Sequence, residues 1–441
     1  MSIFFFLAPD KIKRFTIAVR QDGWRVALAK TRQYIALHRA GHGRTGLPAF
    51  SQRSEPHADA SYLAEFWQEM ARKESFHMSN PPAYLNKTRR IAMIGDLNLP
   101  QCRKYRVEQL EEFWTAQGVE YTYSHYQDIP RATTILQDAT HLMFYRTQNT
   151  SLVSMYLYEA RRLRLPVLYD LDDPLFSVSA YETYENMKAL PAEMKQHFIN
   201  EAPKYLDAMN LADIITVSTP GMRDHTRLYT NRPVHFRRNF ADRATFEAAD
   251  AALKSVEREG AGSFRVAFAS GSMGHEIDFA LIADDITEFL KEDRRRKLVI
   301  LGHFDLNLLP APLRGQLITY GFSDYDSYLE ALASVDCAVM PLTDDAFNRC
   351  KSAVRVIDAA AVAVPSIVTP VGDMANMVQD GKTGHIVGNG KSWLDSLRAM
   401  AEDRETCTTM GRAARADLEA TWAGRPALPV IEPEVVNWVT E

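Results

Sequence analysis

The stretch that decides the fold is NRCKSAVRVIDAAAVAVPSIVTPVGD at residues 348–373, followed by DGKTGH at residues 380–385. The pattern predicts a helix, a short buried strand, a glycine turn, a second helix and a tight turn. Successive helical residues are about 100° apart, so Lys351, Arg355 and Asp358 should share one face of the first helix. Such a face at the carboxyl edge of a parallel sheet suits a nucleotide diphosphate.

The position of Lys351 favours an anion nearby. Lys351 and Ser352 are expected in the first helical turn, where backbone N–H groups are free and the helix dipole attracts negative charge. A lysine is electrostatically unfavourable for the helix itself at this place. The alternative is that Arg355 and Asp358, three residues apart, form an ordinary surface ion pair. The spacing alone favours neither interpretation.

Size and composition indicate a globular enzyme. The chain has 441 residues, 46% hydrophobic and 24% charged, which suggests two or three domains. Its formal charge of −5 gives no signal for nucleic-acid binding. The four cysteines are scattered, which indicates a reduced, cytoplasmic setting without a paired-cysteine metal site. We expect neither a cleavable signal peptide nor a membrane-spanning helix.

Charge is uneven along the chain. Residues 1–50 contain nine basic and two acidic residues, so this segment carries +7 and the remainder −12. Trp24, Tyr34 and several aliphatic residues are interleaved with the basic ones. The segment could lie on an anionic surface at the inner face of the cytoplasmic membrane. Alternatively, it is a helical arm that packs on its own domain or on a partner subunit.

After a linker-like stretch at residues 40–60, short apolar runs alternate with segments of helical period. The apolar runs expected as strands are 91–95, 119–123, 141–145, 166–170, 213–218, 264–269, 298–302, 317–321, 337–341 and 365–369. This alternation predicts an α/β protein with two tandem, doubly wound parallel sheets behind a basic, helical extension. Ligands should lie at the carboxyl ends of the strands and between the domains.

The expected division of the chain follows from the same pattern. It comprises a basic extension and linker at residues 1–88, a first domain at 89–242, a second domain at 243–422, and a tail at 423–441. We expect the tail to return to the first domain.

Polar residues cluster directly after predicted strands of the first domain, where loops on a rigid scaffold often carry function. They are Tyr105, Arg106, Arg146, Asp172 and Asp173. Asp172 and Asp173 could bind a cation, act as a base or hold acceptor hydroxyls. In the alternative interpretation, one of them caps a helix and the other faces water.

In the second domain, the loop from Ser270 to His275 follows the first predicted strand. Its residues Gly271 and Gly274 would let backbone N–H groups approach a phosphate, although this signal is weak by itself. His275 could donate to a diphosphate or could merely start a helix.

Taken together, these residues resemble the nucleotide-sugar domain of bacterial two-Rossmann-domain (GT-B) glycosyltransferases, in particular those of family 4. The resemblance covers residues 264–422 and is carried by Gly271, His275, Asp278, DCAVMP at 336–341, Asn348, Lys351, Ser352, AVPSIV at 363–368, Gly372, and the turn at 380–384. The first domain resembles, more loosely, the partner domain of polysaccharide and O-antigen glycosyltransferases. Tyr105, Arg106, Arg146 and residues 169–173 carry that likeness.

The resemblance implies transfer of a sugar from a nucleotide-diphosphate-sugar donor to a saccharide or lipid-linked glycan acceptor, in surface polysaccharide or lipopolysaccharide synthesis. It implies no tightly bound cofactor and no required metal. Lys351 would neutralise the diphosphate and Asp358 would contact the ribose. The implied donor-binding residues are Gly271, Ser272, Lys351, Ser352, Arg355, Asp358 and Gly372. The implied catalytic residues are Asp172, Asp173, Lys351 and His275, and the implied substrate-binding residues are Tyr105, Arg106, Arg146 and Asn348.

The chain departs from the family pattern at one position. Many members carry two glutamates eight residues apart, and these align with Cys350 and Asp358. Cys350 therefore stands where the resemblance implies an acid in contact with the donor sugar, which leaves the stereochemistry open. Two further functions stay open at this point. One is a nucleotide-sugar-binding partner of another transferase; the other is an epimerase or phosphorylase on the same fold.

Overall fold

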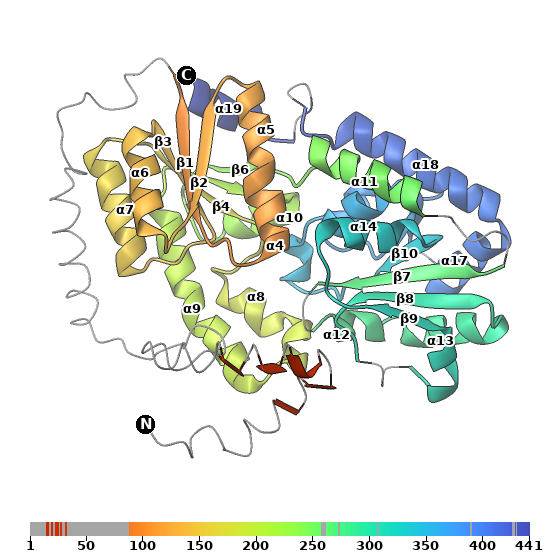
Figure 1. The fold of residues 1–441 in the computed structure, drawn as a ribbon. Coiled ribbons are helices and arrows are strands. Elements are labelled where there is room, and N and C mark those ends of the chain that lie inside the picture. Colours follow the sequence, from red (N-terminus) through yellow and green to blue (C-terminus); the bar gives the residue numbers. More distant parts are fainter. Residues whose placement is uncertain are drawn as a thin grey trace. The chain divides into compact units, whose positions relative to one another are not determined.

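The computed structural model (Figure 1) divides by its internal contacts into two units, Met1–Gln68 and Glu69–Glu441. The residues that it describes are 15, 16, 19, 20, 23–25, 27, 28, 31, 32, 88–256, 262–271, 274–305, 307, 309–388, 390–425, 428 and 430–441. In the first unit, every described residue except Gly23 is helical. The predicted linker at residues 40–60 lies outside the described residues.

The second unit contains two parallel sheets of six strands each, which confirms the predicted α/β fold. The first sheet has the order β2-β1-β3-β4-β5-β6 and the second has the order β12-β11-β10-β7-β8-β9. The strands of the first sheet are β1 (Arg90–Gly95), β2 (Glu120–His125), β3 (His141–Tyr145), β4 (Val167–Leu171), β5 (Ile214–Val217) and β6 (Val234–Phe236). The strands of the second sheet are β7 (Phe264–Ser270), β8 (Arg296–Gly302), β9 (Leu317–Tyr320), β10 (Cys337–Met340), β11 (Ser366–Val368) and β12 (Gly384–Ile386).

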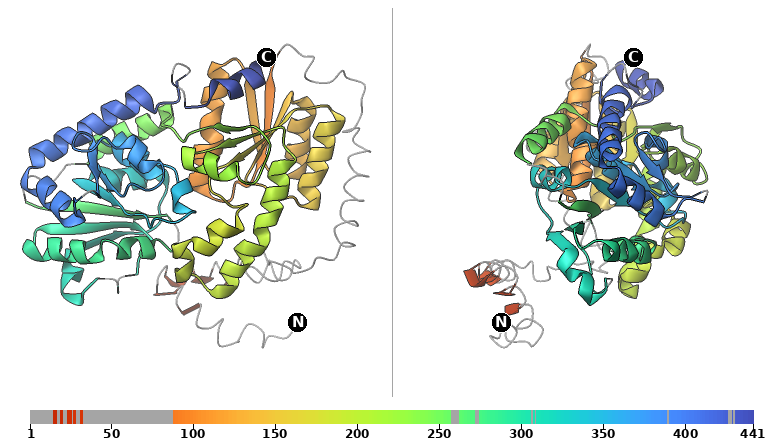
Figure 2. Two further views of the ribbon diagram at one scale, coloured as in Figure 1. Left: turned by 180° about the vertical axis from the view of Figure 1, so that it is seen from behind. Right: turned by 90° about the vertical axis from the view of Figure 1, so that its right-hand side faces the viewer.

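Helices connect the strands and cover the sheets (Figures 1 and 2). Those between β1 and β7 are α4 (Pro100–Arg103), η3 (Lys104–Glu108), α5 (Gln109–Ala116), α6 (Ile129–Asp138), α7 (Ser151–Arg162), α8 (Val178–Thr183), η4 (Glu185–Ala189), α9 (Ala192–Asn210), α10 (Pro220–Thr226) and α11 (Arg243–Ser255). Those after β7 are α12 (His275–Ala280), α13 (Ala283–Glu292), η6 (Ala311–Gln316), α14 (Tyr325–Ala333), η7 (Asn348–Cys350), α15 (Val354–Ala361), α16 (Met374–Met377), α17 (Trp393–Glu402), α18 (Arg404–Thr421) and α19 (Pro433–Thr440). None of the described helices is long and apolar enough to cross a membrane.

The second sheet is buried on both faces, as its apolar strands predict. Successive residues of a strand point to opposite faces, so Ala267 and Phe268 of β7 belong to different cores. One core contains apolar residues of α11, α14, α15 and α18. The other contains apolar residues of α12, α13 and α17. This packing fixes the carboxyl ends of β7 and β10, from which the loops of the site emerge.

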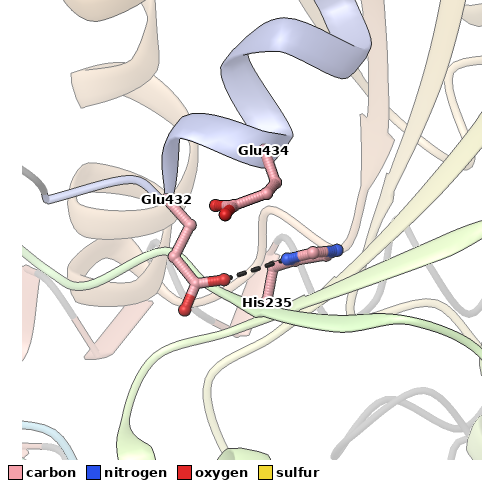
Figure 3. A group of neighbouring side chains, drawn as sticks. All are labelled: His235, Glu432 and Glu434. Carbon is pink, nitrogen blue, oxygen red and sulfur yellow. Dashed lines mark hydrogen bonds and ion pairs between the residues drawn. The ribbon is translucent and has the colours of Figure 1, made fainter.

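The C-terminal tail packs on the first sheet, although α18 belongs to the second domain. Val435 and Val439 of α19 are buried in one cluster with Ile91 and Met93 of β1. The Glu432 carboxylate lies between Arg223 Nη1 at 3.1 Å and His235 Nδ1 at 2.9 Å. Figure 3 shows this carboxylate directed at the His235 ring. Apolar burial and the partly exposed ion pairs of Glu432 therefore hold the tail in place.

The structure differs from the sequence-based expectation in three details. The short edge strands β6 and β12 were not predicted, because three residues give no recognisable apolar run. The spacing of apolar residues at 277–291 predicts one helix, but the structure has two, α12 and α13. The third difference concerns Lys351 and Ser352, which precede α15 instead of forming its first turn: Lys351 is extended, with φ −68° and ψ 142°.

Candidate functional site

A cavity of about 1800 Å³ is lined by residues of both sheets' domains. From the first domain it receives residues that follow β1, β3 and β4, including Cys102, Arg146 and Asp173. From the second domain it receives Gly271 and His275, and also Lys351, Ser352, Val354, Arg355 and Asp358. These are the carboxyl ends of parallel strands, where doubly wound sheets bind ligands.

Two cations of the second domain line this cavity without a carboxylate partner. Among the ion pairs of the described residues, none involves Lys351 or Arg355, and the Arg355 guanidinium donates only to the backbone oxygen of Ala269, at 3.3 Å. The Lys351 ammonium lies 5.6 Å from the ring centre of Tyr184 and 5.4 Å from that of Phe347. Both side chains are half-buried. Positive charge without a paired carboxylate in a half-buried cleft attracts an anion.

The surroundings keep Lys351 charged. Burial lowers the pKa of its ammonium, but Tyr184, Asp173 and Asp278 together raise it above the ordinary value. Burial likewise lowers the pKa of Arg355, which stays protonated because an arginine starts so high. The site therefore presents two positive charges at neutral pH.

The turn that precedes α15 fixes the position of Lys351. The Lys351 N–H donates to the Asn348 carbonyl at 3.0 Å, and the Lys351 carbonyl accepts from the Asp373 N–H at 2.9 Å. Gly372 has φ +67°, and a Cβ there would lie 2.7 Å from the Lys351 carbonyl oxygen. Only glycine fits such a close backbone approach. Gly372 thus supports the lysine turn and does not line the cavity, unlike Gly271.

His275 is held by a buried carboxylate. Its Nδ1 lies 2.9 Å from Asp278 Oδ2, and this oxygen also accepts from the Asn186 side-chain amide at 2.7 Å. Burial lowers the pKa of His275 to about 4, so the ring is neutral at pH 7. Because Nδ1 donates its proton to Asp278, Nε2 is the unprotonated ring nitrogen. The predicted role of His275 as a hydrogen-bond donor to a diphosphate would therefore require uptake of a proton.

The glycine loop before α12 is only partly described. A Cβ at Gly271 would meet no atom within 4 Å, so this position is open toward the cavity. Ser272, a predicted donor-binding residue, lies outside the described residues. Ser352 lines the cavity, and its hydroxyl accepts from the Asn239 amide of the first domain at 2.9 Å.

Asp358 is enclosed by tyrosines from both domains. Its Oδ1 accepts from Tyr325 at 2.8 Å and also from Tyr105, which the sequence placed on the acceptor side. Burial raises the pKa of Asp358 to about 6, although these hydroxyls oppose the shift. Asp358 and both tyrosines line the cavity. Tyr105 is therefore a first-domain residue that contacts the second-domain wall of the cavity.

On the opposite wall, Asp172 and Asp173 lie near Arg146. The Arg146 Nη1 atom is 3.4 Å from Asp172 and 3.6 Å from Asp173, and Asp172 also accepts from Tyr145 at 3.1 Å. Burial raises the pKa of Asp173, while Lys351 across the cavity lowers it and Asp172 raises it. Arg146 has φ +52°, an unusual left-handed conformation that often marks a functional position.

Three residues singled out from the sequence are buried away from the cavity lining. Arg106 is 0% exposed, and its guanidinium binds Asp170 at 3.0 Å together with Arg237, which approaches the same carboxylate at 3.0 Å. Asn348 is also 0% exposed and donates to Thr343 and Asp345. The Cys350 thiol donates to the Ala346 carbonyl at 3.4 Å. These contacts support the walls of the site instead of reaching into it.

Other residues of the site were not singled out from the sequence. Tyr184 and Asn186, which flank the start of η4, cross from the first domain to Lys351 and Asp278. Tyr325 and Phe347 come from the second domain. No motif marks them, since their role depends on which loops meet across the cavity.

One group among the described residues has the composition of a metal site. The ligand atoms of His235, Glu432 and Glu434 lie within 4.8 Å of one another (Figure 3). None of the three lines the cavity. The contacts of Glu432 with Arg223 and His235 already satisfy its charge, so we assign this group to the anchoring of α19.

Comparison with known proteins identifies the second domain. Residues 265–403 match the family model "Glycosyl transferases group 1". The D-inositol 3-phosphate glycosyltransferase of Arthrobacter sp. (strain FB24) is 35% identical over 83 residues, which is 18% of each chain. That of Paenarthrobacter aurescens (strain TC1) is 30% identical over 101 residues, 22% of this chain and 24% of its own. The matched segments thus span about a fifth of these relatives.

The fold has solved counterparts over most of the chain. A glycosyltransferase from Rickettsia africae ESF-5 superposes with a TM-score of 0.52 at 10% identity, covering 81% of this chain and 100% of that one. Sucrose-phosphate synthase from Thermosynechococcus elongatus gives 0.51 at 14% identity, covering 76% and 95%. The chain therefore has the GT-B fold, and residues 265–403 match the group 1 glycosyl transferase model.

Proposed function

We propose that this glycosyltransferase moves a sugar from a nucleotide-diphosphate-sugar donor to a saccharide or lipid-linked glycan acceptor, in the synthesis of a surface polysaccharide. The observation that carries the proposal is the pair of cations, Lys351 and Arg355, that line the cavity without a carboxylate partner. A diphosphate supplies the missing negative charge. The neighbouring Asp358 supplies a carboxylate for ribose hydroxyls.

The chemical step places charge where these cations lie. The bond between the anomeric carbon and the diphosphate oxygen breaks, and the nucleoside diphosphate leaves with the electron pair. Lys351 and Arg355 stabilise the charge that grows on it, and the open backbone at Gly271 allows close approach. The acceptor oxygen forms the new bond to the anomeric carbon.

The acceptor half is the wall that holds Asp172, Asp173 and Arg146. Burial raises the pKa of Asp173, which makes its carboxylate a stronger base for the acceptor hydroxyl proton. Arg146 orients both carboxylates. In an inverting reaction one of them would take the proton; in a retaining reaction the departing phosphate would take it.

Nucleoside diphosphates test the donor site directly. We expect at least one of UDP, GDP, ADP and TDP to raise the melting temperature of the full chain, more than the matching monophosphate does. The Lys351→Met variant should lose this difference between diphosphate and monophosphate. Failure of all four diphosphates to stabilise the wild-type chain would contradict the proposal.

A second candidate, a nucleotide-sugar-binding partner without transfer activity, is favoured by Cys350. The thiol is buried and bonded to a backbone carbonyl at the position where the resemblance implies an acid. The two functions separate in one assay. A panel of nucleotide sugars, incubated with membranes or glycan acceptors, should give labelled product for a transferase and only reversible binding for a partner protein.

The basic segment at residues 1–50 supports a peripheral position on an anionic membrane. We expect the full chain to sediment with vesicles that contain phosphatidylglycerol, and not with pure phosphatidylcholine vesicles. A matched variant with the nine basic residues of the segment changed to glutamine should stay in the supernatant. If it sediments equally well, the segment is not the membrane contact.

A further inference from the structure

We infer that Asn186 is a positioning residue, contributed by the first domain, that fixes the orientation and tautomer of His275 in the second domain. The inference rests on the proposed function for the role of His275 in the reaction. The contact between Asn186, Asp278 and His275 does not depend on that function. Nothing in the sequence singles out Asn186, which lies in the short helix η4.

The contact is a chain of two hydrogen bonds through one carboxylate oxygen. Asn186 Nδ2 donates to Asp278 Oδ2 at 2.7 Å, and His275 Nδ1 lies 2.9 Å from the same oxygen. The other oxygen, Oδ1, accepts from the Thr343 N–H at 3.0 Å and from its hydroxyl at 3.3 Å. Asp278 is 0% exposed, and these donors lower its pKa against the effect of burial, so it stays ionised.

An ionised Asp278 determines what His275 presents to the cavity. The carboxylate accepts the Nδ1 proton, which leaves Nε2 as a hydrogen-bond acceptor for a ligand hydroxyl. The charged groups that face His275 are Asp278 on its own helix, Arg355 on α15 and Lys351 in the turn before α15. Both cations oppose protonation of the ring. Asn186 gives Asp278 a hydrogen-bond donor that carries no charge. It therefore stabilises the ionised carboxylate without changing the number of charges around His275.

The backbone of η4 is fitted to the same loop. Gly274 has φ +103°, and a Cβ at this position would lie 3.1 Å from the Asn186 carbonyl oxygen. The Asn186 Oδ1 atom is buried without a hydrogen-bond partner among the described residues. Burial of the amide oxygen without a partner costs free energy. The hydrogen bond from the amide nitrogen to Asp278 must offset this cost. The arrangement thus satisfies Nδ2 and leaves Oδ1 unpaired.

The consequence is that the donor half of the site is complete only when the first domain is in place. With Asn186 withdrawn, Asp278 would lose a donor and gain water, and the His275 ring would be free to change tautomer. The cleft would then bind the donor without presenting Nε2 correctly. Asn186 therefore links the meeting of the two domains to the readiness of His275.

The test uses two variants of the full chain, Asn186→Ala and the isosteric Asn186→Asp, which places a second carboxylate against Asp278. NMR of chain labelled with ¹⁵N in the histidine rings, with His275 assigned through His275→Gln, reports tautomer and pKa. In the wild type we expect a single Nδ1–H tautomer. In both variants we expect a tautomer mixture and a His275 pKa that rises toward its ordinary value, because water replaces the buried contact in Asn186→Ala and a second negative charge faces the ring in Asn186→Asp.

Transfer kinetics provide the second readout. We expect kcat to fall roughly tenfold or more while KM for the donor changes less than about threefold, because positioning and not binding is lost. Lys188→Ala, an exposed change in the same helix, should behave as wild type. A wild-type tautomer and wild-type kcat in both variants would overturn the inference. If instead no nucleoside diphosphate binds the wild type, the proposed function fails while the NMR result still decides the role of Asn186.

Discussion

Two groups of charged residues lie at the carboxyl ends of the two sheets, and they differ in how their charges are balanced. In the first domain, Asp170 is fully buried between Arg106 and Arg237, both of which bind its carboxylate. In the second domain, Lys351 and Arg355 line the cavity, and no carboxylate of the described residues pairs with either.

The difference indicates that the Asp170 group supports the fold, whereas Lys351 and Arg355 are available to a ligand. Removal of three charges from water is tolerated in the first group because the guanidinium donors satisfy both carboxylate oxygens. In the second group, neither cation forms an ion pair with a carboxylate of the described residues, so both are available to a bound anion. We therefore expect changes in the first group to alter folding, and changes in the second group to alter binding and rate. The following predictions test that division.

The largest effect is expected at Lys351. Lys351→Met retains the length of the side chain but removes its charge, so transfer should fall by about a thousandfold, since charge on the leaving diphosphate is no longer stabilised. The free energy of unfolding should change little, because Lys351 forms no ion pair among the described residues, although Tyr184, Asp173 and Asp278 favour its charged form. Initial rates with radiolabelled donor and thermal denaturation measure the two quantities. Unchanged transfer would remove Lys351 from the mechanism.

Lys291→Ala serves as the control for that experiment, because Lys291 is exposed on α13, far in sequence from the lysine turn. Its transfer rate and unfolding free energy should equal those of the wild type. A comparable loss of transfer in this control would show that the assay responds to net charge and not to the site.

Asp170 should give the opposite result. Asp170→Asn leaves two buried guanidinium groups without their counter-charge, which should lower the free energy of unfolding by about 3 kcal/mol. Asp344→Asn breaks the exposed pair with Arg349 and should cost less than about 1 kcal/mol. Chemical denaturation compares the two variants. Equal stabilities would mean that the Asp170 group contributes no more than a surface ion pair.

The same two groups of charged residues show which features of the fold and the site could be predicted from the sequence. The strands around both are continuous apolar runs, so their existence and the doubly wound fold were predictable from the sequence. Arg106 was predicted to contact substrate because it follows a strand, but its partner Arg237 lies 131 residues later and nothing local pairs them. Lys351, which was predicted to bind a diphosphate, lines the cavity, but it precedes the helix instead of starting it.

The residues that cross the cavity could not be predicted. Asn186 and Tyr184 meet the second domain because of how the two domains pack, and no spacing rule relates positions that far apart. Tyr105 was noted as polar and placed on the acceptor side, whereas it reaches Asp358 in the other domain. Helical period and motif spacing describe one helix, strand or loop at a time. They therefore identify the residues on one side of the cavity better than the contacts across it.

Arg355 should have a smaller effect than Lys351. Its guanidinium keeps one hydrogen bond, to the Ala269 carbonyl, so part of its role is to hold that backbone. Arg355→Met should reduce transfer roughly thirtyfold and weaken nucleoside diphosphate binding by a similar factor. Arg355→Lys should recover most of the loss if charge is what matters. No recovery would assign Arg355 to support, which would move it to the first group.

The smallest effect, and the sharpest test of the division, is expected at Asp358. Burial raises its pKa to about 6 from an ordinary value of 3.8. Between these values the folded state binds more protons than the unfolded state, so the contribution of this carboxyl to stability is full below pH 4 and is lost as the pH rises through 6. At pH 7.5 the ionised carboxylate therefore costs stability. Asp358→Asn removes that cost, and its Oδ1 can still accept from Tyr105 and Tyr325.

We expect Asp358→Asn to raise the free energy of unfolding at pH 7.5 by about 1–2 kcal/mol and to flatten its dependence on pH between 4 and 6. Nucleoside diphosphate affinity should fall, because the ribose hydroxyls lose a charged acceptor. Denaturation at several pH values and calorimetric titration measure the two effects. A variant that loses stability at pH 7.5 would place Asp358 with Asp170, among the charges that the fold needs. If the variant gains stability and loses affinity, Asp358 belongs with Lys351, among the charged residues that serve ligand binding and not folding.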